Sequence, residues 1–507
     1  MHLLAGLVWA HASLVSVPVS QNPDTARDRP LLRVLAINDF HGALEPQVWP
    51  WSGGRAVGGA VALKSWLDSL TRTCRCATIR LDAGDEMQGT LISNYSFGRP
   101  AIAAMNAFGI DAAAIGNHEF DWSVDTLRAR MAGAHYRFLA ANISDSGTTV
   151  TPAWAEPWTV IERGGVRVAV IGLALPETPV NTAPRNVRGL AFGDGAAAVR
   201  RVLPRARAGA DYVIVVAHEG AFCDRAGGAC HGEIVDLARG LDSGSVDLIV
   251  SGHTHSLVNT VVNGIPIVQA RSSGAGIAVV DFLRGRQVRA RIETPFADLV
   301  HPDDGVADSV RAYAGAVAAL TRRPVARFEQ ELRRVGDEYG LGRLIADAQR
   351  RIAGSDVALV NNGGIRADVP AGAVTYGDLY RVQPFQNRLV RLAVTGSVLR
   401  DAVEHALARP DGRADAHVAG LEAWYDPARP VGRRITRLRL ADGAAVDDAH
   451  TYTLAVSDFL AAGGSGYAML RNARQDDVGM TDLDALVQYL GDLRQPIAAP
   501  TDARLHR

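Results

Sequence analysis

Gly116-Asn117-His118-Glu119-Phe120-Asp121 gathers an amide, an imidazole and carboxylates within six consecutive positions. The stretch follows the apolar residues 112–115, which are expected to form the end of a buried strand. Burying polar groups costs free energy unless other groups pair with them, so the stretch indicates a metal site, a ligand site or a catalytic cleft. A polar turn at the surface is the alternative that these six residues alone leave open.

The same arrangement, a short apolar run followed by a polar cluster, recurs in the first half of the chain. The other runs are residues 31–37, 78–81, 212–217 and 247–250. The clusters after them are Asn38-Asp39-Phe40-His41-Gly42, Asp82-Ala83-Gly84-Asp85-Glu86, His218-Glu219-Gly220 and Ser251-Gly252-His253-Thr254-His255. Most of the runs are rich in Val, Ile and Leu, as expected of strands that are buried on both faces.

Helix-like segments at 59–70, 101–108 and 195–208 lie between some of these runs. Alternating strands and helices predict a layered α/β sheet. In such sheets, ligands bind beyond the carboxyl ends of the strands. Strand ends that carry Asp, Asn and His therefore predict one shared site.

The donors in these clusters are Asp39, His41, Asp85, Asn117, His218, His253 and His255. One divalent ion takes roughly four to six ligands, so this set suits two ions that share a bridging carboxylate, for which Asp85 is the natural choice. Mixed His, Asp and Asn ligands favour Zn²⁺, Mn²⁺, Co²⁺ or iron over a soft thiolate site. Two ions about 3.5–4 Å apart can generate a hydroxide nucleophile for in-line phosphoryl displacement. Any one of these residues alone is more often an ordinary core or loop residue.

Taken together, these motifs resemble those of the calcineurin-like metallophosphoesterases, and Asn117-His118-Glu119-Phe120-Asp121 is similar to the secreted 5′-nucleotidase and UDP-sugar hydrolase branch. The resemblance implies an N-terminal four-layered αββα domain in which an Asp bridges two metals. It assigns Asp39, His41, Asp85 and His255 to one ion, and Asp85, Asn117, His218 and His253 to the other. In that branch Gln or Asn often replaces His255, which bears on metal preference.

The resemblance also assigns His118 to catalysis, with Asp121 orienting it. A carboxylate three residues away can fix the ring tautomer, and the imidazolium that it favours can stabilise charge developing on a phosphoryl group. The alternative is a core histidine, or one that only supports a metal ligand. We expect Glu119 to be structural.

The strand pattern stops near His301-Pro302-Asp303-Asp304-Gly305, and near-helical spacing follows over 308–320. This pattern predicts a linker helix over 301–325 between a domain at 31–300 and a second at 326–507, although a last helix of the first domain is the alternative. Domain closure is expected at this linker.

Three loops follow: Asn361-Asn362-Gly363-Gly364-Ile365-Arg366, Gln383-Pro384-Phe385-Gln386-Asn387, and residues 458–467 with Phe459 and Ser465. Without further context, the first loop could be an ordinary turn, and the aromatic residues of the other two loops could belong to the core. They resemble the substrate-binding loops of the 5′-nucleotidase C-terminal domain, so the resemblance covers about 31–490 and implies a C-terminal α/β substrate-binding domain. It implies that Asn361 and Arg366 hold the nucleotide and that Phe385 and Phe459 stack on its base. Ser465 replaces the usual Asp for ribose, and Asp337 replaces an Arg of some members.

A chain of 507 residues is too long for one core, and its net charge of −1 provides no basic field for a nucleic acid polymer. The apolar residues 3–10 and Ala10-His11-Ala12 predict a cleaved signal peptide within a leader at 1–30, and hence a periplasmic or secreted protein. No Lys or Arg precedes the run, so a disordered leader is the alternative. No later stretch reaches the ~20 apolar residues of a transmembrane segment.

The four cysteines form two close pairs, and disulfides are the favoured interpretation in an exported protein. Cys223 and Cys230 bracket a loop that a disulfide could close. Cys74 and Cys76 are expected to be too close to bridge comfortably, and a zinc site using all four thiolates is the alternative.

The leading hypothesis from the sequence is an exported, dinuclear-metal phosphoesterase that hydrolyses 5′-nucleotides to nucleoside and phosphate through a metal-bound hydroxide. The same fold acting on UDP-sugars, nucleoside polyphosphates or 2′,3′-cyclic nucleotides is an alternative, and sulfur-compound hydrolases also use related scaffolds. A non-catalytic nucleotide-binding protein is a different class, against which the intact His118 and Asp121 argue. The sequence does not determine the oligomeric state.

Overall fold

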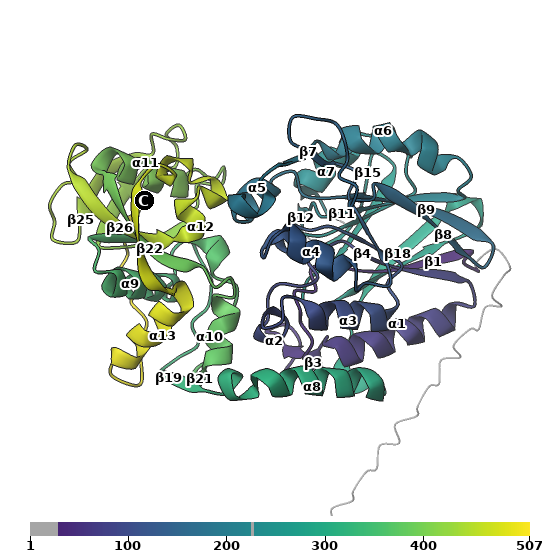
Figure 1. Ribbon diagram of the computed structural model, residues 1–507, viewed down its shortest axis with the longest axis horizontal. Coiled ribbons are helices and arrows are strands. Elements are labelled where there is room, and N and C mark those ends of the chain that lie inside the picture. Colours follow the sequence, from purple (N-terminus) through teal and green to yellow (C-terminus); the bar gives the residue numbers. More distant parts are fainter. Residues whose placement is uncertain (1–28, 225–227) are drawn as a thin grey trace, which may run out of the picture.

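The computed structural model describes residues 29–224 and 228–507, and it contains two domains joined by the long helix α8 (Asp304–Thr321) (Figure 1). The expected signal peptide lies outside the described residues, apart from the last two positions of the leader. Among the helices of the described part, none is long and apolar enough to cross a membrane.

The N-terminal domain contains two six-stranded sheets. In order across the first sheet, the strands are β18 (Val288–Glu293), β17 (Ile277–Phe282), β1 (Leu32–Ile37), β4 (Ala77–Asp82), β5 (Ala112–Ala114) and β6 (Arg137–Leu139). In order across the second, they are β15 (Leu257–Val262), β16 (Ile265–Ala270), β14 (Leu248–Ser251), β11 (Tyr212–Ala217), β9 (Val166–Leu173) and β8 (Trp158–Arg163). The central strands of both sheets are parallel, so their carboxyl ends lie at the same edge.

Strand β1 shows why the layers form. Its six residues are all buried, and neighbouring side chains point to opposite faces of the sheet. Val34 packs in a core between the two sheets with Ile79 and Ile214, whereas Leu35 packs on the outer face with Leu63 and Phe108. The sheets therefore stack between two helical layers, as the expected αββα domain requires.

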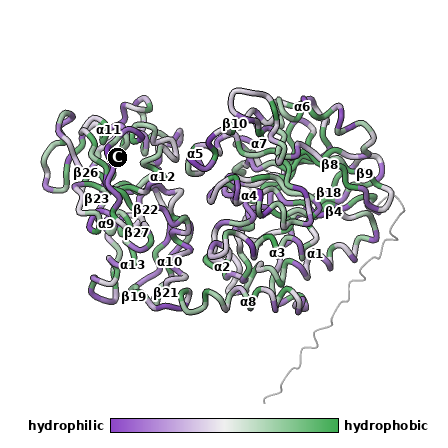
Figure 2. The backbone as a smooth tube through the Cα atoms, in the orientation of Figure 1, coloured by the Kyte–Doolittle hydropathy of each residue, from purple (hydrophilic) through white to green (hydrophobic). Residues whose placement is uncertain are grey.

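Helices cover the outer faces of both sheets (Figure 1). The helices of this domain are α1 (Ala60–Cys74), α2 (Leu91–Asn94), α3 (Arg99–Phe108), α4 (Val124–Met131), α5 (Thr178–Asn181), α6 (Gly195–Arg207) and α7 (Glu233–Arg239). The helices expected at 59–70, 101–108 and 195–208 are present as α1, α3 and α6. Hydrophobic segments run through the strands of the domain in Figure 2.

The C-terminal domain is built on a five-stranded sheet. Its strands, in order, are β23 (Ala416–Ala419), β20 (Val357–Asn361), β26 (Thr451–Ser457), β22 (Arg388–Thr395) and β27 (Arg474–Thr481). One face packs on α9 (Gly340–Ala353) and α13 (Asp482–Asp492), and the other packs on α11 (Gly396–Ala406). A smaller sheet contains β25 (Ile435–Leu440), β24 (Leu421–Tyr425) and β28 (Leu505–His506). Two short helices, α10 (Tyr376–Val382) and α12 (Asp458–Ala461), lie beside the loops that face the first domain.

Four two-stranded pairings complete the fold. They are β2 (Gln47–Val48) with β3 (Ala56–Val57), β7 (Ile143–Asp145) with β10 (Leu190–Phe192), β12 (Phe222–Cys223) with β13 (Cys230–His231), and β19 (Pro324–Phe328) with β21 (Gly372–Thr375). Helix α8 packs on α1, α2 and α3 and then leads into β19.

The cysteines form two disulfides, Cys74–Cys76 and Cys223–Cys230. The expectation that Cys74 and Cys76 are too close to bridge was wrong: Arg75 adopts a left-handed conformation where α1 ends, and the two Cα atoms lie 5.1 Å apart. That separation is within the usual range for a disulfide. Because all four cysteines are paired in this way, the alternative of a four-thiolate zinc site is also wrong.

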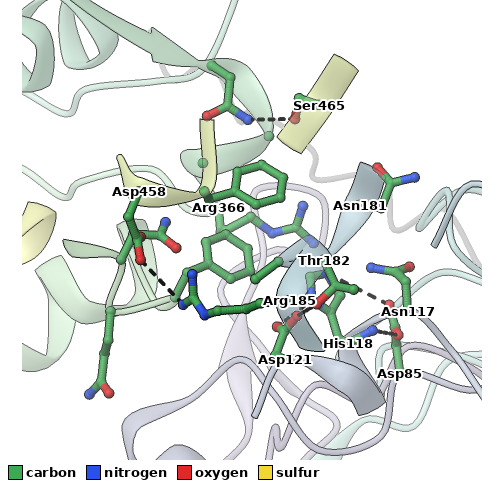
Figure 3. A pocket seen from close by; sticks show the side chains of 18 of the residues that line it. Asp85, Asn117, His118, Asp121, Asn181, Thr182, Arg185, Arg366, Asp458 and Ser465 are labelled. Carbon is green, nitrogen blue, oxygen red and sulfur yellow. Dashed lines mark hydrogen bonds and ion pairs between the residues drawn. The ribbon is translucent and has the colours of Figure 1, made fainter. Parts of the chain in front are cut away.

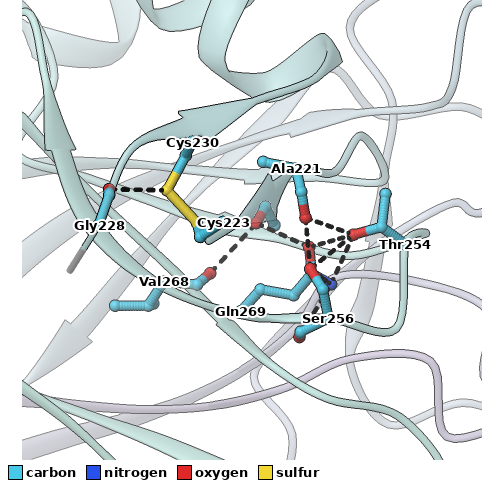
Figure 4. Close-up of a disulfide and its surroundings, with 9 residues drawn as sticks. Ala221, Cys223, Gly228, Cys230, Thr254, Ser256, Val268 and Gln269 are labelled. Carbon is cyan, nitrogen blue, oxygen red and sulfur yellow. Dashed lines mark hydrogen bonds between the residues drawn. A yellow bond between two sulfur atoms is a disulfide. The ribbon is translucent and has the colours of Figure 1, made fainter. Parts of the chain in front are cut away.

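The Cys223–Cys230 disulfide joins β12 to β13 beside one of the predicted metal-binding loops (Figure 4). Ala221, just before β12, accepts a hydrogen bond of 2.9 Å from the Thr254 hydroxyl. Thr254 stands between His253 and His255, so this contact ties the hairpin to the loop that carries both histidines.

Candidate metal centre and substrate cleft

The predicted ligands stand on strained backbone at the ends of strands. Five of the seven, Asp39, His41, Asp85, His253 and His255, have φ between 50° and 72°. This left-handed region is uncommon for residues other than glycine, and such a conformation costs on the order of 1–3 kcal/mol per residue. The surrounding fold maintains this strain where the carboxyl ends of β1, β4 and β14 meet.

Asp39, His41 and His255 form one group of ligand atoms. The Nε2 atoms of His41 and His255 lie 2.9 Å apart, and His255 Nε2 lies 3.5 Å from Asp39 Oδ1. His41 Nδ1 lies 2.7 Å from the Gln88 carbonyl, to which it donates, so Nε2 presents its lone pair to the group. Two imidazole nitrogens directed at one point beside a carboxylate fit a metal ion.

Asp39, Asp85 and His218 form the second group. Asp85 Oδ2 lies 3.0 Å from His218 Nε2 and 3.9 Å from His41 Nε2, so this carboxylate stands between the two groups, as a bridging ligand must. His218 Nδ1 donates to the Ala83 carbonyl at 2.8 Å, which directs Nε2 inward. Asn117 Oδ1 is buried and makes no hydrogen bond. An unsatisfied buried acceptor at this point again fits a metal ion.

His253 is close to these groups but belongs to neither of them. Its ring centroid lies 5.3 Å from that of His218, and it lines the same cavity as Asp85 and Asn117. Its backbone N–H donates to both carboxylate oxygens of Asp39 at 3.0 Å. The loop therefore holds Asp39 in place through its backbone, independently of any role of the His253 ring as a ligand.

The protonation states suit coordination by nitrogen and oxygen. Burial lowers the pKa of His41 and of His253 to about 3, which keeps both rings neutral. Burial acts to raise the pKa of Asp39, but His255 outweighs it and lowers that pKa to about 2. Burial acts to lower the pKa of His218, but Asp85 outweighs it and raises that pKa to about 10. An ion that binds at His218 has to displace this proton.

His118 is oriented as the sequence predicts. Its Nδ1 lies 2.7 Å from Asp121 Oδ2, and its backbone N–H donates to Asp85 Oδ1 at 2.9 Å (Figure 3). Burial acts to lower the pKa of His118, but Asp121 and Asp85 outweigh it and raise that pKa above its ordinary value. The geometry thus favours a positively charged ring next to the predicted metal ligands.

Glu119 is structural, as expected. Its carboxylate accepts hydrogen bonds of 2.8 Å from the backbone N–H groups of Asp85, Glu86 and Gly116. One side chain therefore joins the loop after β4 to the loop after β5, and it holds Asp85 in place.

A cavity of about 210 Å³ between the domains is lined both by predicted metal ligands and by predicted substrate residues. Asp85, Asn117, His118, Asp121, His253 and His255 line it together with Asn361, Arg366, Phe385, Phe459 and Ser465. Figure 3 shows Arg366 between the Asp85 and Ser465 sides of this cavity. The structure thus brings together residues that the sequence places in separate domains.

The two predicted base-stacking rings have different environments. Phe385 lies nearly parallel to the His118 ring, with centroids 5.4 Å apart. Phe459 packs on Gly464, where a Cβ atom would lie only 2.3 Å from its ring. Asn361 Nδ2 donates to Ser465 Oγ at 3.1 Å, which joins the first C-terminal loop to the last.

Sequence reasoning missed residues 178–187, which connect the two sides of the cleft. Thr182 Oγ1 donates to Asp121 Oδ1 at 2.9 Å, and Asn186 Nδ2 donates to the Asp121 carbonyl at 2.7 Å. Arg185 lies 3.3 Å from Asp458 of the other domain. This segment follows an apolar run, residues 168–175, but it contains no Asp or His; only its two prolines, Pro179 and Pro184, mark it as an irregular connection.

Comparisons with known proteins agree with this architecture. Residues 316–472 match the family model of the 5′-nucleotidase C-terminal domain, and residues 70–268 match that of the bacterial capsule synthesis protein PGA_cap. Endonuclease YhcR of Bacillus subtilis is 30% identical over 94% of this chain, which spans only 41% of that longer protein. Protein UshA of Yersinia enterocolitica is 28% identical over 90% of both chains.

A solved structure extends the likeness to three dimensions. The 5′-nucleotidase precursor from Thermus thermophilus has a TM-score of 0.83 and 28% identity, covering 94% of this chain and 99% of that one. The similarity therefore includes both domains and the connection between them. The chain is thus similar to 5′-nucleotidases over both domains, and its residues 316–472 match the 5′-nucleotidase C-terminal domain.

Proposed function

We propose that this protein is a metal-dependent phosphoesterase that hydrolyses 5′-nucleotides to nucleoside and phosphate. The observation that carries the proposal is the shared cavity, in which His118 and Asp121 stand beside the metal-ligand groups and face the predicted nucleotide-binding residues. The names of its relatives, UshA and 5′-nucleotidase, support the same activity. Two disulfides and a relative described as a cell wall protein support a periplasmic or secreted location.

We assign the predicted ligands to two divalent ions, Zn²⁺, Mn²⁺, Co²⁺ or iron. Asp39, His41 and His255 would hold one ion, and Asn117, His218 and His253 the other, with Asp85 facing both. Bound ions of this kind neutralise phosphoryl oxygens and lower the pKa of water.

His118 contributes charge stabilisation through its ring. Asp121 fixes the tautomer through Nδ1 and favours the imidazolium, and Phe385 covers one face of the ring and keeps water from it. A preorganised cation in a buried site stabilises charge that develops on the phosphoryl group more strongly than water would.

Arg366 contributes a second cation. In the described part of the chain its guanidinium makes no ion pair, although Phe385 lies 5.8 Å from it. A guanidinium presents a planar fork of donors that matches a phosphate group. We therefore assign Arg366 to the phosphate, and Asn361, Phe385, Phe459 and Ser465 to the nucleoside.

Phosphate release from a panel of 5′-nucleotides, measured with the metal-loaded protein, tests the proposal. His118→Ala should lower kcat by about 100- to 1000-fold, as expected for loss of one transition-state contact. The matched control is His135→Ala, because His135 is exposed and lies outside the cavity. Unchanged turnover in His118→Ala would overturn the catalytic assignment, and nucleotide binding without any release would favour a non-catalytic binding protein.

A further inference from the structure

The metal-ligand groups border a second cavity, of about 510 Å³. His255 and Arg366 line both cavities, whereas His41 lines only the second. A phosphate held at the metal ligands is therefore accessible from two directions. The nucleoside residues Phe385, Phe459 and Ser465 line only the first cavity, so the second has no occupant under the proposed function.

Two tryptophans form part of the wall of this second cavity. Trp49 and Trp51, on the connection between β2 and β3, have nearly parallel rings with centroids 6.1 Å apart. Trp51 is 42% exposed. Exposed aromatic rings in a cavity are a common feature of binding sites, because their flat faces stack on rings of a ligand.

Arg271 lies over the same tryptophan. Its guanidinium carbon is 4.2 Å from the centroid of the Trp51 ring, and within the described residues it makes no ion pair. The other arginines that line only this cavity differ, because Arg334 pairs with Asp368 at 3.3 Å and Arg381 pairs with Asp378 at 2.6 Å. A guanidinium placed over an indole ring can still direct N–H groups at an anion.

The backbone fixes Arg271 relative to the metal ligands. Arg271 has a φ of 62°, and its N–H donates to the Ser256 carbonyl at 3.0 Å. Its carbonyl accepts a hydrogen bond of 2.5 Å from Asn38 Nδ2, which also donates to Asp39 Oδ2 at 2.6 Å. The unpaired cation is therefore positioned by the same loops that position Asp39 and His255.

We propose that Trp49, Trp51 and Arg271 form a subsite for a second nucleotide attached to the reacting phosphorus, so that the protein also hydrolyses dinucleotides. This proposal rests on the proposed function, which supplies the phosphate position. The second base stacks on the tryptophans, and a phosphate of the second nucleotide pairs with Arg271. Water adds to phosphorus, the P–O bond to the leaving oxygen breaks, and that oxygen receives the proton, so no further reactant is needed.

Kinetic comparison of three substrates tests the subsite. AMP lacks a second nucleotide, the dinucleoside monophosphate ApA has a second base, and pApA adds a terminal phosphate. Trp51→Ala should lower kcat/KM about tenfold for ApA and pApA and leave AMP within twofold, because stacking contributes about 1–3 kcal/mol per base. Arg271→Gln should affect pApA more than ApA.

Trp424→Ala and Arg437→Gln are matched controls, because Arg437 lies 4.9 Å over Trp424 in the small sheet, outside both cavities. Calorimetric titration of pApA against the metal-loaded His118→Ala protein measures binding with turnover suppressed, and its Kd should weaken about tenfold when Trp51→Ala is added. The subsite is overturned if Trp51→Ala lowers kcat/KM equally for the dinucleotides and for AMP, or if it lowers kcat/KM only for UDP-glucose. It is also overturned if the control variants lose as much activity on dinucleotides as Trp51→Ala and Arg271→Gln do. Failure of the wild-type protein to release phosphate from AMP would overturn the proposed function, while the calorimetry would still decide the subsite.

Discussion

Thr182 donates a hydrogen bond of 2.9 Å to one carboxylate oxygen of Asp121, and the other oxygen of the same group lies 2.7 Å from His118 Nδ1. The positioning of His118 therefore depends on a residue 61 positions away from Asp121. We expect Thr182→Val to lower kcat about tenfold, because a hydrogen bond to a charged group is worth about 1.5 kcal/mol or more. KM should change little, and Thr182→Ser should restore kcat.

Steady-state kinetics with a 5′-nucleotide check this prediction, and Thr148→Val in an exposed turn is the control. Equal kcat for Thr182→Val and the wild type would show that Asp121 holds His118 without help. Loss of kcat in the serine variant as well would point to a packing defect instead.

Metal binding should stabilise the N-terminal domain, because buried carboxylates and imidazoles converge there. Elemental analysis should give two ions per chain, and ions at a hundred times their Kd should add about 2.7 kcal/mol per site to the free energy of unfolding. Asn117→Ala should lose one ion, whereas Asn259→Ala on β15 should lose none. A single ion in the wild-type protein would contradict the bridging role of Asp85.

The packing of Phe459 on Gly464 predicts a selective defect. In Gly464→Ala the new methyl group would overlap the Phe459 ring, which has to move out of its present position. We expect KM for AMP to rise several-fold and KM for ribose 5-phosphate, which lacks a base, to stay unchanged. Gly491→Ala is the control, because no atom lies near its Cβ position. A similar rise in KM for AMP and for ribose 5-phosphate would show that Phe459 does not stack on the base.

The Arg185–Asp458 ion pair should influence domain orientation more than stability. Arg185 is largely exposed, and exposed pairs contribute about 0–1 kcal/mol, so Arg185→Gln should leave the thermal midpoint almost unchanged. Because the pair joins the two domains, its loss should increase the radius of gyration in solution scattering. Asp458→Asn should have the same effect, and the double variant should add little.

If the wild-type protein and both variants gave the same scattering curve with and without a nucleotide analogue, the ion pair would have no part in orientation. The expected closure at residues 301–325 would then fail as well.

The buried carboxyl of Asp482 should make the stability of the folded protein depend on pH. Burial raises the pKa of this carboxyl to about 7, although Asn387 donates to it. The folded protein therefore retains a proton that the unfolded chain releases near pH 4, so this group's contribution is present below pH 4 and is lost as the pH rises to about 7. The thermal midpoint of Asp482→Asn, relative to wild type, should increase between pH 4 and pH 8. Asp492→Asn at the far end of α13 should show no such trend.

Local patterns were enough to predict a layered α/β sheet and the polar side chains at its strand ends, whereas the four layers were implied by the resemblance. Buried strands can be recognised in the sequence as apolar runs, and their ends as polar clusters. Both features depend on residues that are adjacent in the chain. The position of Asp85 between the two ligand groups followed from the meeting of strand ends. The resemblance placed Asn361 and Phe385 in the same cleft, and the structure brings them to His118.

Contacts between distant segments were decided only by the tertiary structure. Thr182 reaches Asp121, Arg185 reaches Asp458, and Arg271 covers Trp51, yet Thr182, Arg185, Arg271 and Trp51 belong to no sequence pattern. The Cys74–Cys76 disulfide depends on the left-handed backbone at Arg75, which residue spacing does not reveal. The sequence by itself determined which side chains stand at the strand ends, because strand periodicity is local. The packing of the two domains decided which of those side chains meet, because that depends on surfaces formed only after the whole chain has folded.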